Sequence, residues 1–220
     1  MVIQMKIAGA IFDMDGTLLD SMPIWDRVGI DYLAGLGIPA RPDLPEKILT
    51  MSMRQAAAYF RADYGVALPE QEIIDGINAR IEAFYRDTAP AKEGVRDFLE
   101  ALAQRGVKMC VATATDRPLA EAALRRTGLL GAFSRILTCT ETGAGKDQPD
   151  VFLQAQKALD TPLEQTVVVE DALYAIQTAK RAGFPVVAVY DASSRADQEQ
   201  IKGLADYYFP SLSGAWEALL

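Results

Sequence analysis

Histidine is absent from all 220 residues of the chain, and this absence excludes several kinds of catalytic site. A Ser-His-Asp triad and a Cys-His pair both need an imidazole as general base, and His-ligated zinc needs it as a metal ligand. Any chemistry must therefore use carboxylates, lysine, hydroxyl groups and a metal ion that prefers oxygen ligands.

Cysteine, long apolar runs and positive charge are also scarce. Cys110 and Cys139 lie at or near segments that we predict to be strands, and we interpret them as buried free thiols. Asp13 interrupts the apolar run near the N-terminus, so we expect no membrane span. The net charge of −8 argues against a nucleic-acid or anionic-membrane partner. With no signal-peptide pattern, we expect a cytoplasmic protein, with a monomer as the default state.

The most informative stretch is an apolar run over residues 7–12 that ends at two carboxylates, Asp13 and Asp15. The run is apolar on both faces instead of alternating, which is typical of a buried parallel strand. If the backbone stays extended beyond Phe12, the side chains of Asp13 and Asp15 project to the same side. The two acids would then lie at the carboxyl end of a strand, where open α/β sheets bind their ligands.

The rest of the chain divides into a helical insert and an alternating region. Residues 21–88 show apolar positions at helical spacing near 25–36, 48–60 and 70–86, and we predict about four helices in this segment as a whole. From residue 89 onward, helices and strands alternate, with strands at 107–112, 135–138, 166–169, 185–189 and 207–209. The pattern predicts an α/β fold: a three-layer Rossmann-like parallel sheet core (residues 1–20 and 89–220) with an inserted all-helical cap domain (residues 21–88).

Polar residues recur where these strands end. Because the carboxyl ends of parallel strands meet at one edge of a sheet, we expect a cluster of Asp13, Asp15, Thr113, Lys146, Glu170 and Asp171. Thr115 takes the place of Thr113 if the second strand ends two residues later. So many acidic oxygens repel one another without a cation, and oxygen ligands without His or Cys suit Mg²⁺.

Four short motifs carry a family resemblance. The run from Asp13 to Thr17, a Thr at the end of the second strand, Lys146 ahead of a helix, and Glu170-Asp171 after an apolar strand resemble the motifs of the haloacid dehalogenase superfamily. The likeness covers essentially the whole chain, and the helical insert resembles the cap of subfamily I, in the β-phosphoglucomutase and phosphoglycolate phosphatase branch.

The resemblance implies a role for each motif residue. Asp13 would be the nucleophile that forms an aspartyl-phosphate, and Asp15 the general acid and then the base. Magnesium would be held by Asp13, the Asp15 carbonyl, Asp171 and, through water, Glu170. The transferred phosphoryl group would be bound by Thr113 and Lys146, and by the main-chain N–H groups of Met14, Asp15 and Ala114. The cap would close over the site and exclude water during transfer.

Departures from the family pattern help to choose among the possible reactions. Trp25 stands where the phosphoglucomutases carry a cap histidine that promotes transfer to a sugar, so its presence favours a phosphatase acting on a small phosphorylated metabolite. A sugar-phosphate mutase is the alternative, and a non-catalytic phosphate- or partner-binding protein is a second one. In the cap, Trp25, Ser52 and Arg54 are candidates for contacting the substrate, whose identity no pattern in the sequence indicates.

Overall fold

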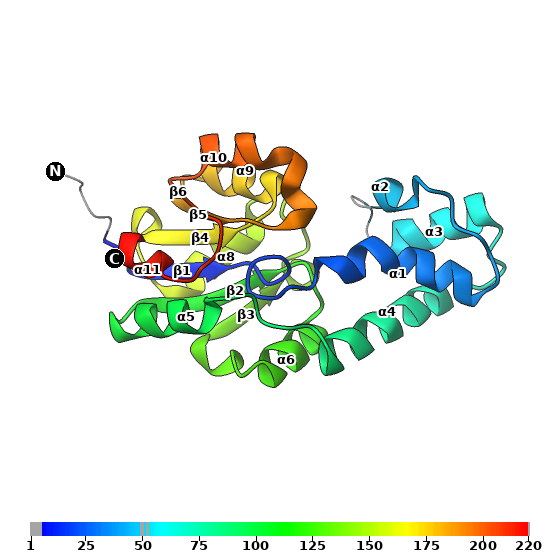
Figure 1. The fold of residues 1–220 in the computed structure, drawn as a ribbon, viewed down its shortest axis with the longest axis horizontal. Helices are drawn as coiled ribbons and strands as arrows, with labels where there is room; N and C mark the ends of the chain where they lie inside the picture. Colours follow the sequence, from blue (N-terminus) through cyan, green and yellow to red (C-terminus); the bar gives the residue numbers. More distant parts are fainter. Residues whose placement is uncertain (1–5, 49–50, 52, 220) are drawn as a thin grey trace. The chain divides into compact units, whose positions relative to one another are not determined.

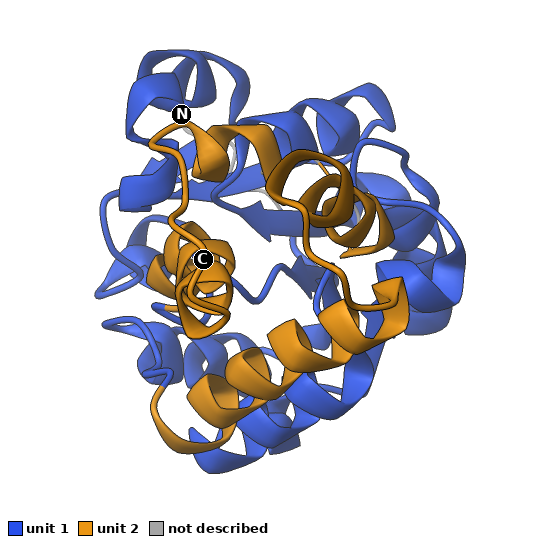
Figure 2. Cartoon of the chain, turned by 90° about the vertical axis from the view of Figure 1, so that its right-hand side faces the viewer, with its two compact units in different colours: residues 1–20, 89–220 blue, residues 21–88 orange. Residues whose placement is uncertain are grey.

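The computed structural model describes residues 6–48, 51 and 53–219. The chain separates into two compact units, which Figure 2 colours separately. Unit 1 comprises Met1–Asp20 and Ala89–Leu220, and unit 2 comprises Ser21–Thr88. Unit 1 contains a sheet with helices on both faces, whereas unit 2 is built from helices.

In the part of the chain that the structure describes, six strands form one sheet in the order β3-β2-β1-β4-β5-β6, and every neighbouring pair is parallel (Figure 1). The strands are β1 (Gly9–Phe12), β2 (Lys108–Thr113), β3 (Arg135–Thr138), β4 (Thr166–Glu170), β5 (Val186–Val189) and β6 (Tyr207–Phe209). The predicted α/β fold with a parallel sheet is confirmed. The strand order reverses between β1 and β4, and such a reversal opens a ligand crevice beyond the strands' carboxyl ends.

Helices cover both faces of the sheet, which explains why the central strands are apolar throughout. On one face α8 (Asp150–Leu159), α9 (Leu173–Arg181) and α10 (Gln198–Leu204) share a buried cluster with Ile11. The next residue, Phe12, points to the other face, as strand geometry requires. There it meets Phe98 of α5 (Val95–Gln104) edge-on, with ring centroids 6.1 Å apart.

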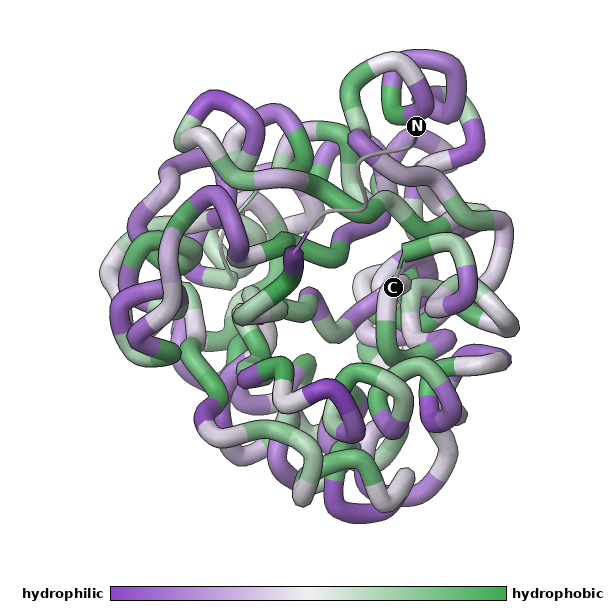
Figure 3. Tube along the Cα trace, turned by 90° about the vertical axis from the view of Figure 1, so that its left-hand side faces the viewer, coloured by the Kyte–Doolittle hydropathy of each residue, from purple (hydrophilic) through white to green (hydrophobic). Residues whose placement is uncertain are grey.

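On this second face α6 (Arg117–Arg126) packs against β3, and α11 (Ala215–Leu219) packs against α5. Figure 1 shows α5 and α6 on the opposite side of the sheet from α9 and α10. Figure 3 shows hydrophilic residues on many of the outer turns of the trace. Burying each large apolar side chain stabilises the fold by about 1.5–3 kcal/mol. The sheet core therefore gives the strand ends a rigid base.

Unit 2 contains α1 (Met22–Gly35), α2 (Leu44–Ile48), α3 (Met53–Tyr64) and α4 (Glu70–Asp87). Ile73, Ile77 and Ile81 are buried along α4 at a spacing of four, which places them on one face of the helix. The helical pattern predicted around residues 48–60 starts too early for α3, because α2 ends at Ile48 and α3 begins at Met53. Pro45 lies in the first turn of α2, where its fixed φ favours the start of a separate short helix.

Some short elements were not predicted. The four-residue helix α7 (Cys139–Thr142) follows β3 directly and is held by a capping box between Thr138 and Glu141. Within the described part of the chain, 3-10 turns also occur at Leu130–Ala132, Leu163–Gln165 and Ala192–Asp197. Asp116 occupies the N-cap position of α6, but its side chain accepts a 2.8 Å hydrogen bond from Thr140 and makes no capping hydrogen bond.

Both cysteines are free thiols, in agreement with the sequence prediction. Cys110 is buried in β2, and burial raises the pKa of its thiol to about 12, so the reactive thiolate is suppressed. Cys139 is partly buried, and burial raises its pKa as well. Among the described residues, no helix has the length and apolar character needed to cross a membrane.

Candidate active site

Asp13 and Asp15 follow β1 at the point where the strand order reverses. The Asp13 N–H donates a 2.9 Å hydrogen bond to the carbonyl of Val169, so parallel pairing with β4 continues past the last residue of β1. Asp13 is 6% exposed, and Asp15 is partly exposed. The strand therefore delivers one acid into a buried position and leaves the other at its margin.

The turn after Asp15 depends on Gly16. Its φ of +88° lies in the left-handed region that side chains disfavour. A Cβ on Gly16 would also lie 2.5 Å from Oδ2 of Asp171. The turn is closed by the N–H groups of Leu18 and Leu19, which both donate to the carbonyl of Met14 at 2.9 Å. Glycine is therefore required for both the backbone conformation and the close approach of Asp171.

Lys146 lies buried between two carboxylates. It comes from the loop between α7 and α8, and its side chain is 3% exposed. Its Nζ donates hydrogen bonds to Oδ1 of Asp13 and, at 2.7 Å, to Oε1 of Glu170. Burial acts to lower the pKa of Lys146, but the charges of Asp13 and Glu170 outweigh it and raise this pKa well above its ordinary value. The neighbouring carboxylates therefore favour the charged, ammonium form of Lys146.

Glu170 and Asp171, at the end of β4, add two buried carboxylates. Oε2 of Glu170 accepts the N–H groups of Asp171 (2.9 Å) and Ala172 (3.1 Å), while Oδ1 of Asp171 accepts the hydroxyl of Thr17 at 3.0 Å. Burial raises the pKa of Glu170 to about 7, against the lowering effect of Lys146. Burial and the neighbouring carboxylates of Glu170 and Asp13 raise the pKa of Asp171 well above its ordinary range.

This carboxylate cluster fits a hard divalent cation. One oxygen from each of Asp13, Glu170 and Asp171 lies within 4.8 Å of the others, and all three residues are buried. Within the described ranges, Oδ2 of Asp13 is buried and takes part in no hydrogen bond. An acceptor desolvated in this way is costly unless a cation or donor faces it. Three carboxylates without histidine or cysteine match the ligand preference of Mg²⁺.

The two threonines after β2 have different partners. Thr113 ends the strand, and its Oγ1 accepts the N–H of Thr115 at 3.0 Å. The Thr115 hydroxyl donates to Oδ2 of Asp15 at 2.7 Å. Both threonines are buried, whereas Ala114 between them is exposed. Thr115 is therefore the hydroxyl that orients Asp15, while phosphate binding by Thr113 and Ala114 stays a prediction.

Neither a role for Thr17 nor the contact between Thr115 and Asp15 was predicted from the sequence. Thr17 belongs to the motif that begins at Asp13, but its partner Asp171 lies 154 residues away. Thr115 could have been found from its position, because it is the next hydroxyl residue after Thr113 and lies two residues beyond the end of β2, the strand that pairs with β1. In both cases the tertiary pairing of strand ends, not local sequence, selects the partner.

The structure describes two of the three residues that were predicted to contact the substrate from the helical insert. Trp25 lies on α1, and its Nε1 donates a 3.1 Å hydrogen bond to the hydroxyl of Tyr85, which is fully buried on α4. Arg54 is exposed on α3, and Ser52 lies outside the described residues. The contact of Trp25 explains its role in packing unit 2, and substrate contacts by all three residues stay predictions.

Comparison with known proteins gives a family match over most of the chain. The family model for haloacid dehalogenase-like hydrolases matches residues 7–183. Hexitol phosphatase B of Escherichia coli K12 is 28% identical over 211 residues, covering 94% of both chains. Validoxylamine A 7'-phosphate phosphatase of Streptomyces hygroscopicus subsp. limoneus is also 28% identical, covering 92% of this chain and 97% of its own.

Solved structures share the fold. A mutant of CbbY from Rhodobacter sphaeroides, crystallised with xylulose-(1,5)bisphosphate, superposes with a TM-score of 0.81. It is 25% identical and covers 94% of this chain and 95% of its own. CbbY of the same organism in complex with phosphate gives a TM-score of 0.80 at 26% identity, over 94% of this chain and 95% of its own.

Proposed function

The chain belongs to the haloacid dehalogenase-like hydrolases, and on that basis we propose that it is a Mg²⁺-dependent phosphatase for a small phosphorylated sugar or polyol. The observation that supports this most directly is the buried cluster in which Lys146 bridges Asp13 and Glu170 beside Asp171. The substrate class follows the relatives, which include a hexitol phosphatase and a phosphatase of phosphorylated carbohydrates.

In the first half-reaction a carboxylate oxygen of Asp13 attacks phosphorus. The bond from phosphorus to the ester oxygen breaks, and the departing oxygen takes a proton from Asp15. Lys146 holds Asp13 and offsets the repulsion between the anionic nucleophile and the anionic phosphate. Asp13, Asp171 and Glu170, with the Asp15 carbonyl, would hold Mg²⁺, which supplies positive charge that stabilises the transferring phosphoryl group.

In the second half-reaction water attacks the phosphorus of the aspartyl-phosphate. Asp15, now ionised, accepts the proton of that water, and the bond between phosphorus and Asp13 breaks to release inorganic phosphate. The Thr115 hydroxyl keeps Asp15 oriented through both steps by its 2.7 Å hydrogen bond. Asp13 returns to its starting form, so the cycle balances.

We also propose that unit 2 is the cap that selects the substrate. The segments that enter and leave it are paired in unit 1, where the Asp20 N–H donates to the Pro90 carbonyl at 2.9 Å, and the Lys92 N–H donates to the Leu18 carbonyl at 2.9 Å. These bonds would fix both linkers at their base. A monomeric state and a cytoplasmic location stay predictions.

A substrate screen tests the proposed function. We expect the purified protein with Mg²⁺ to release inorganic phosphate from hexitol and hexose phosphates, and to lose this activity on addition of a chelator. A hexose 1-phosphate offered with its bisphosphate should yield phosphate and not the 6-phosphate. Formation of the 6-phosphate would instead identify a mutase. No turnover of any phosphoester in the panel would favour the non-catalytic alternative.

Thr115→Val should lower kcat/KM, which reports the first half-reaction, only where the leaving group needs a proton. The change keeps the shape of the side chain but removes the hydroxyl that holds Asp15. We expect kcat/KM for an alkyl phosphate to fall about tenfold, as for the loss of one strong hydrogen bond. With p-nitrophenyl phosphate, whose leaving group needs no proton, the change in kcat/KM should be small. Thr115→Ser, which keeps the hydroxyl, is the matched control, and equal losses on both substrates would contradict the role of Thr115.

A further inference from the structure

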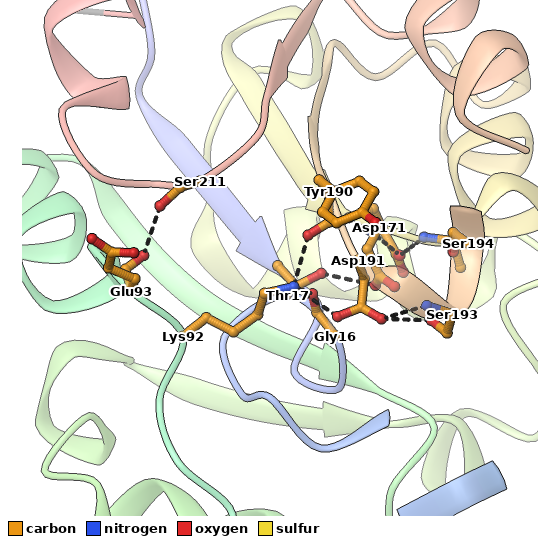
Figure 4. Close-up of polar contacts among 12 residues, drawn as sticks. Gly16, Thr17, Lys92, Glu93, Asp171, Tyr190, Asp191, Ser193, Ser194 and Ser211 are labelled. Atoms are coloured by element: carbon orange, nitrogen blue, oxygen red, sulfur yellow. Dashed lines mark hydrogen bonds and ion pairs between the residues drawn. The ribbon is translucent and has the colours of Figure 1, made fainter. Parts of the chain in front are cut away.

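Lys92 joins three segments of unit 1 beside the proposed metal site. Its Nζ donates to the carbonyl of Gly16 at 2.6 Å, to the carbonyl of Tyr190 at 2.8 Å and to Oδ2 of Asp191 at 2.7 Å. Figure 4 shows the lysine reaching between the turn after β1 and the residues that follow β5. An ammonium group has three N–H donors, and all three are used. Lys92 is therefore fixed in place and has no donor left for a substrate.

The charge of Lys92 is neutralised where it lies. The side chain of Lys92 is 17% exposed and that of Asp191 is 6% exposed, so the ion pair is largely shielded from solvent. The other oxygen of Asp191 accepts the N–H (3.0 Å) and the hydroxyl (2.7 Å) of Ser193. Burial raises the pKa of Asp191, but the hydrogen bonds from Lys92 and Ser193 prevail and lower it. The Lys92–Asp191 pair therefore adds little net charge to the site and acts mainly by holding the neighbouring segments in position.

From Lys92 a continuous set of contacts leads to a proposed metal ligand. The carbonyl that Lys92 holds belongs to the peptide between Gly16 and Thr17. The hydroxyl of Thr17 in turn donates to Oδ1 of Asp171 at 3.0 Å. Gly16 itself approaches Asp171 so closely that an added Cβ would overlap its carboxylate. Moving this peptide would therefore move the carboxylate of Asp171.

We propose that Lys92, held by Asp191, is a positioning residue that aligns Asp171 for the divalent cation through the Gly16–Thr17 peptide and the Thr17 hydroxyl. The inference deepens the proposed function, since it concerns the same metal site. Residues that orient metal ligands typically change metal affinity by about 10–100-fold when they are replaced. Lys92 would thus act without touching metal or substrate.

Calorimetric titration of the whole protein with Mg²⁺ alone tests this inference. Lys92→Met should weaken Mg²⁺ binding about tenfold or more. The matched control is Lys180→Met, which removes another lysine of unit 1 whose 2.7 Å ion pair with Asp206 is remote from the cluster, and its affinity should equal that of the wild type. Because removing a positive charge near the site would by electrostatics alone tighten Mg²⁺ binding, the expected weakening has the opposite sign to a simple charge effect.

A second substitution decides whether Lys92 acts through Thr17. Thr17→Ala should weaken Mg²⁺ binding by itself, and adding Lys92→Met should then weaken it little further, because the link is already broken. Fully additive effects, or unchanged or tighter binding in folded Lys92→Met, would overturn the inference. If Lys92→Met does not fold, Lys92→Gln replaces it in the same titration and should also weaken binding, again with the opposite sign to the charge effect.

The Mg²⁺ titration and the substrate screen can fail independently of each other. Mg²⁺ affinity is measured without substrate, so it is informative even if no phosphoester in the panel is hydrolysed. An active enzyme whose Lys92→Met variant binds Mg²⁺ normally would contradict the positioning role and leave the phosphatase proposal standing.

Discussion

Asp13→Asn is expected to lower kcat by at least about a thousandfold, as the loss of a catalytic nucleophile does in other enzymes. The amide cannot form the aspartyl-phosphate, because it has no ionised oxygen to attack phosphorus. The fold should be kept, because the strand pairing of Asp13 uses its main-chain N–H and Lys146 retains its 2.7 Å bond to Glu170. Steady-state phosphate release and an unfolding curve measure the two effects separately.

Asp20→Asn is the matched control for this experiment. It makes the same chemical change seven residues further on, at an exposed position in the same unit, and should leave kcat unchanged. Rapid acid quenching with substrate should trap a phosphoryl group on the wild type and on Asp20→Asn but not on Asp13→Asn. Retained turnover or a trapped phosphoryl group in Asp13→Asn would refute Asp13 as the nucleophile.

That the motif residues lie together could be predicted from the sequence, because it follows from the topology of a parallel sheet. Asp13 and Glu170 come directly after buried apolar runs, and a parallel sheet brings the ends of such runs to one edge. The structure indeed joins Asp13, Lys146 and Glu170 by hydrogen bonds. The strand order, which places β1 beside β4, was not predicted, yet it is what brings Asp13 within a hydrogen bond of Val169.

Contacts that join a motif residue to a residue outside the motifs could not be predicted from the sequence. Whether Thr113 or Thr115 faces Asp15 depends on a strand end, and β2 runs to Thr113, one residue beyond the expected end. Lys92 lies in no motif, and its partners Gly16 and Asp191 are 76 and 99 residues away. Such pairs depend on how segments meet in three dimensions, about which local propensity and periodicity carry no information.

The helical unit shows the same limit at the level of secondary structure. The isoleucines of α4 repeat at helical spacing, so that helix could be placed from sequence. The split between α2 and α3 could not be placed, because apolar residues continue at helical spacing across it while Pro45 starts a separate turn. Short helices such as α7 depend on capping contacts more than on an apolar stripe, and a four-residue segment shows no period.

The metal-free protein is expected to lose stability as the pH rises from about 5 to 8. Burial raises the pKa of Glu170 from 4.5 to about 7 and that of Asp171 well above 3.8. The folded state therefore binds both protons more tightly than the unfolded state. The contribution of Glu170 to stability is complete below pH 4.5 and is lost as the pH rises through about 7. Since one pKa unit corresponds to about 1.4 kcal/mol, the loss for Glu170 is on the order of 3 kcal/mol.

Magnesium should remove this dependence. A bound cation neutralises the carboxylates that repel one another, and a ligand at a hundred times its Kd adds about 2.7 kcal/mol to the free energy of unfolding. Urea unfolding at several pH values, with a chelator and with saturating Mg²⁺, measures both effects. The two curves should meet near pH 5, where protons take the place of the cation, and diverge toward pH 8.

Asp171→Asn tests whether the clustered carboxylates cause the dependence of stability on pH and Mg²⁺. It removes one of the three clustered negative charges while keeping an oxygen that can accept the Thr17 hydroxyl. The metal-free variant should be more stable than the wild type at pH 8 and should gain little from Mg²⁺. Asp206→Asn, at an exposed ion pair in the same unit, should keep the wild-type response to Mg²⁺. A wild-type curve that is flat without metal would contradict the raised pKa values of Glu170 and Asp171. An Asp171→Asn variant that Mg²⁺ stabilises fully would show that Asp171 does not bind the cation.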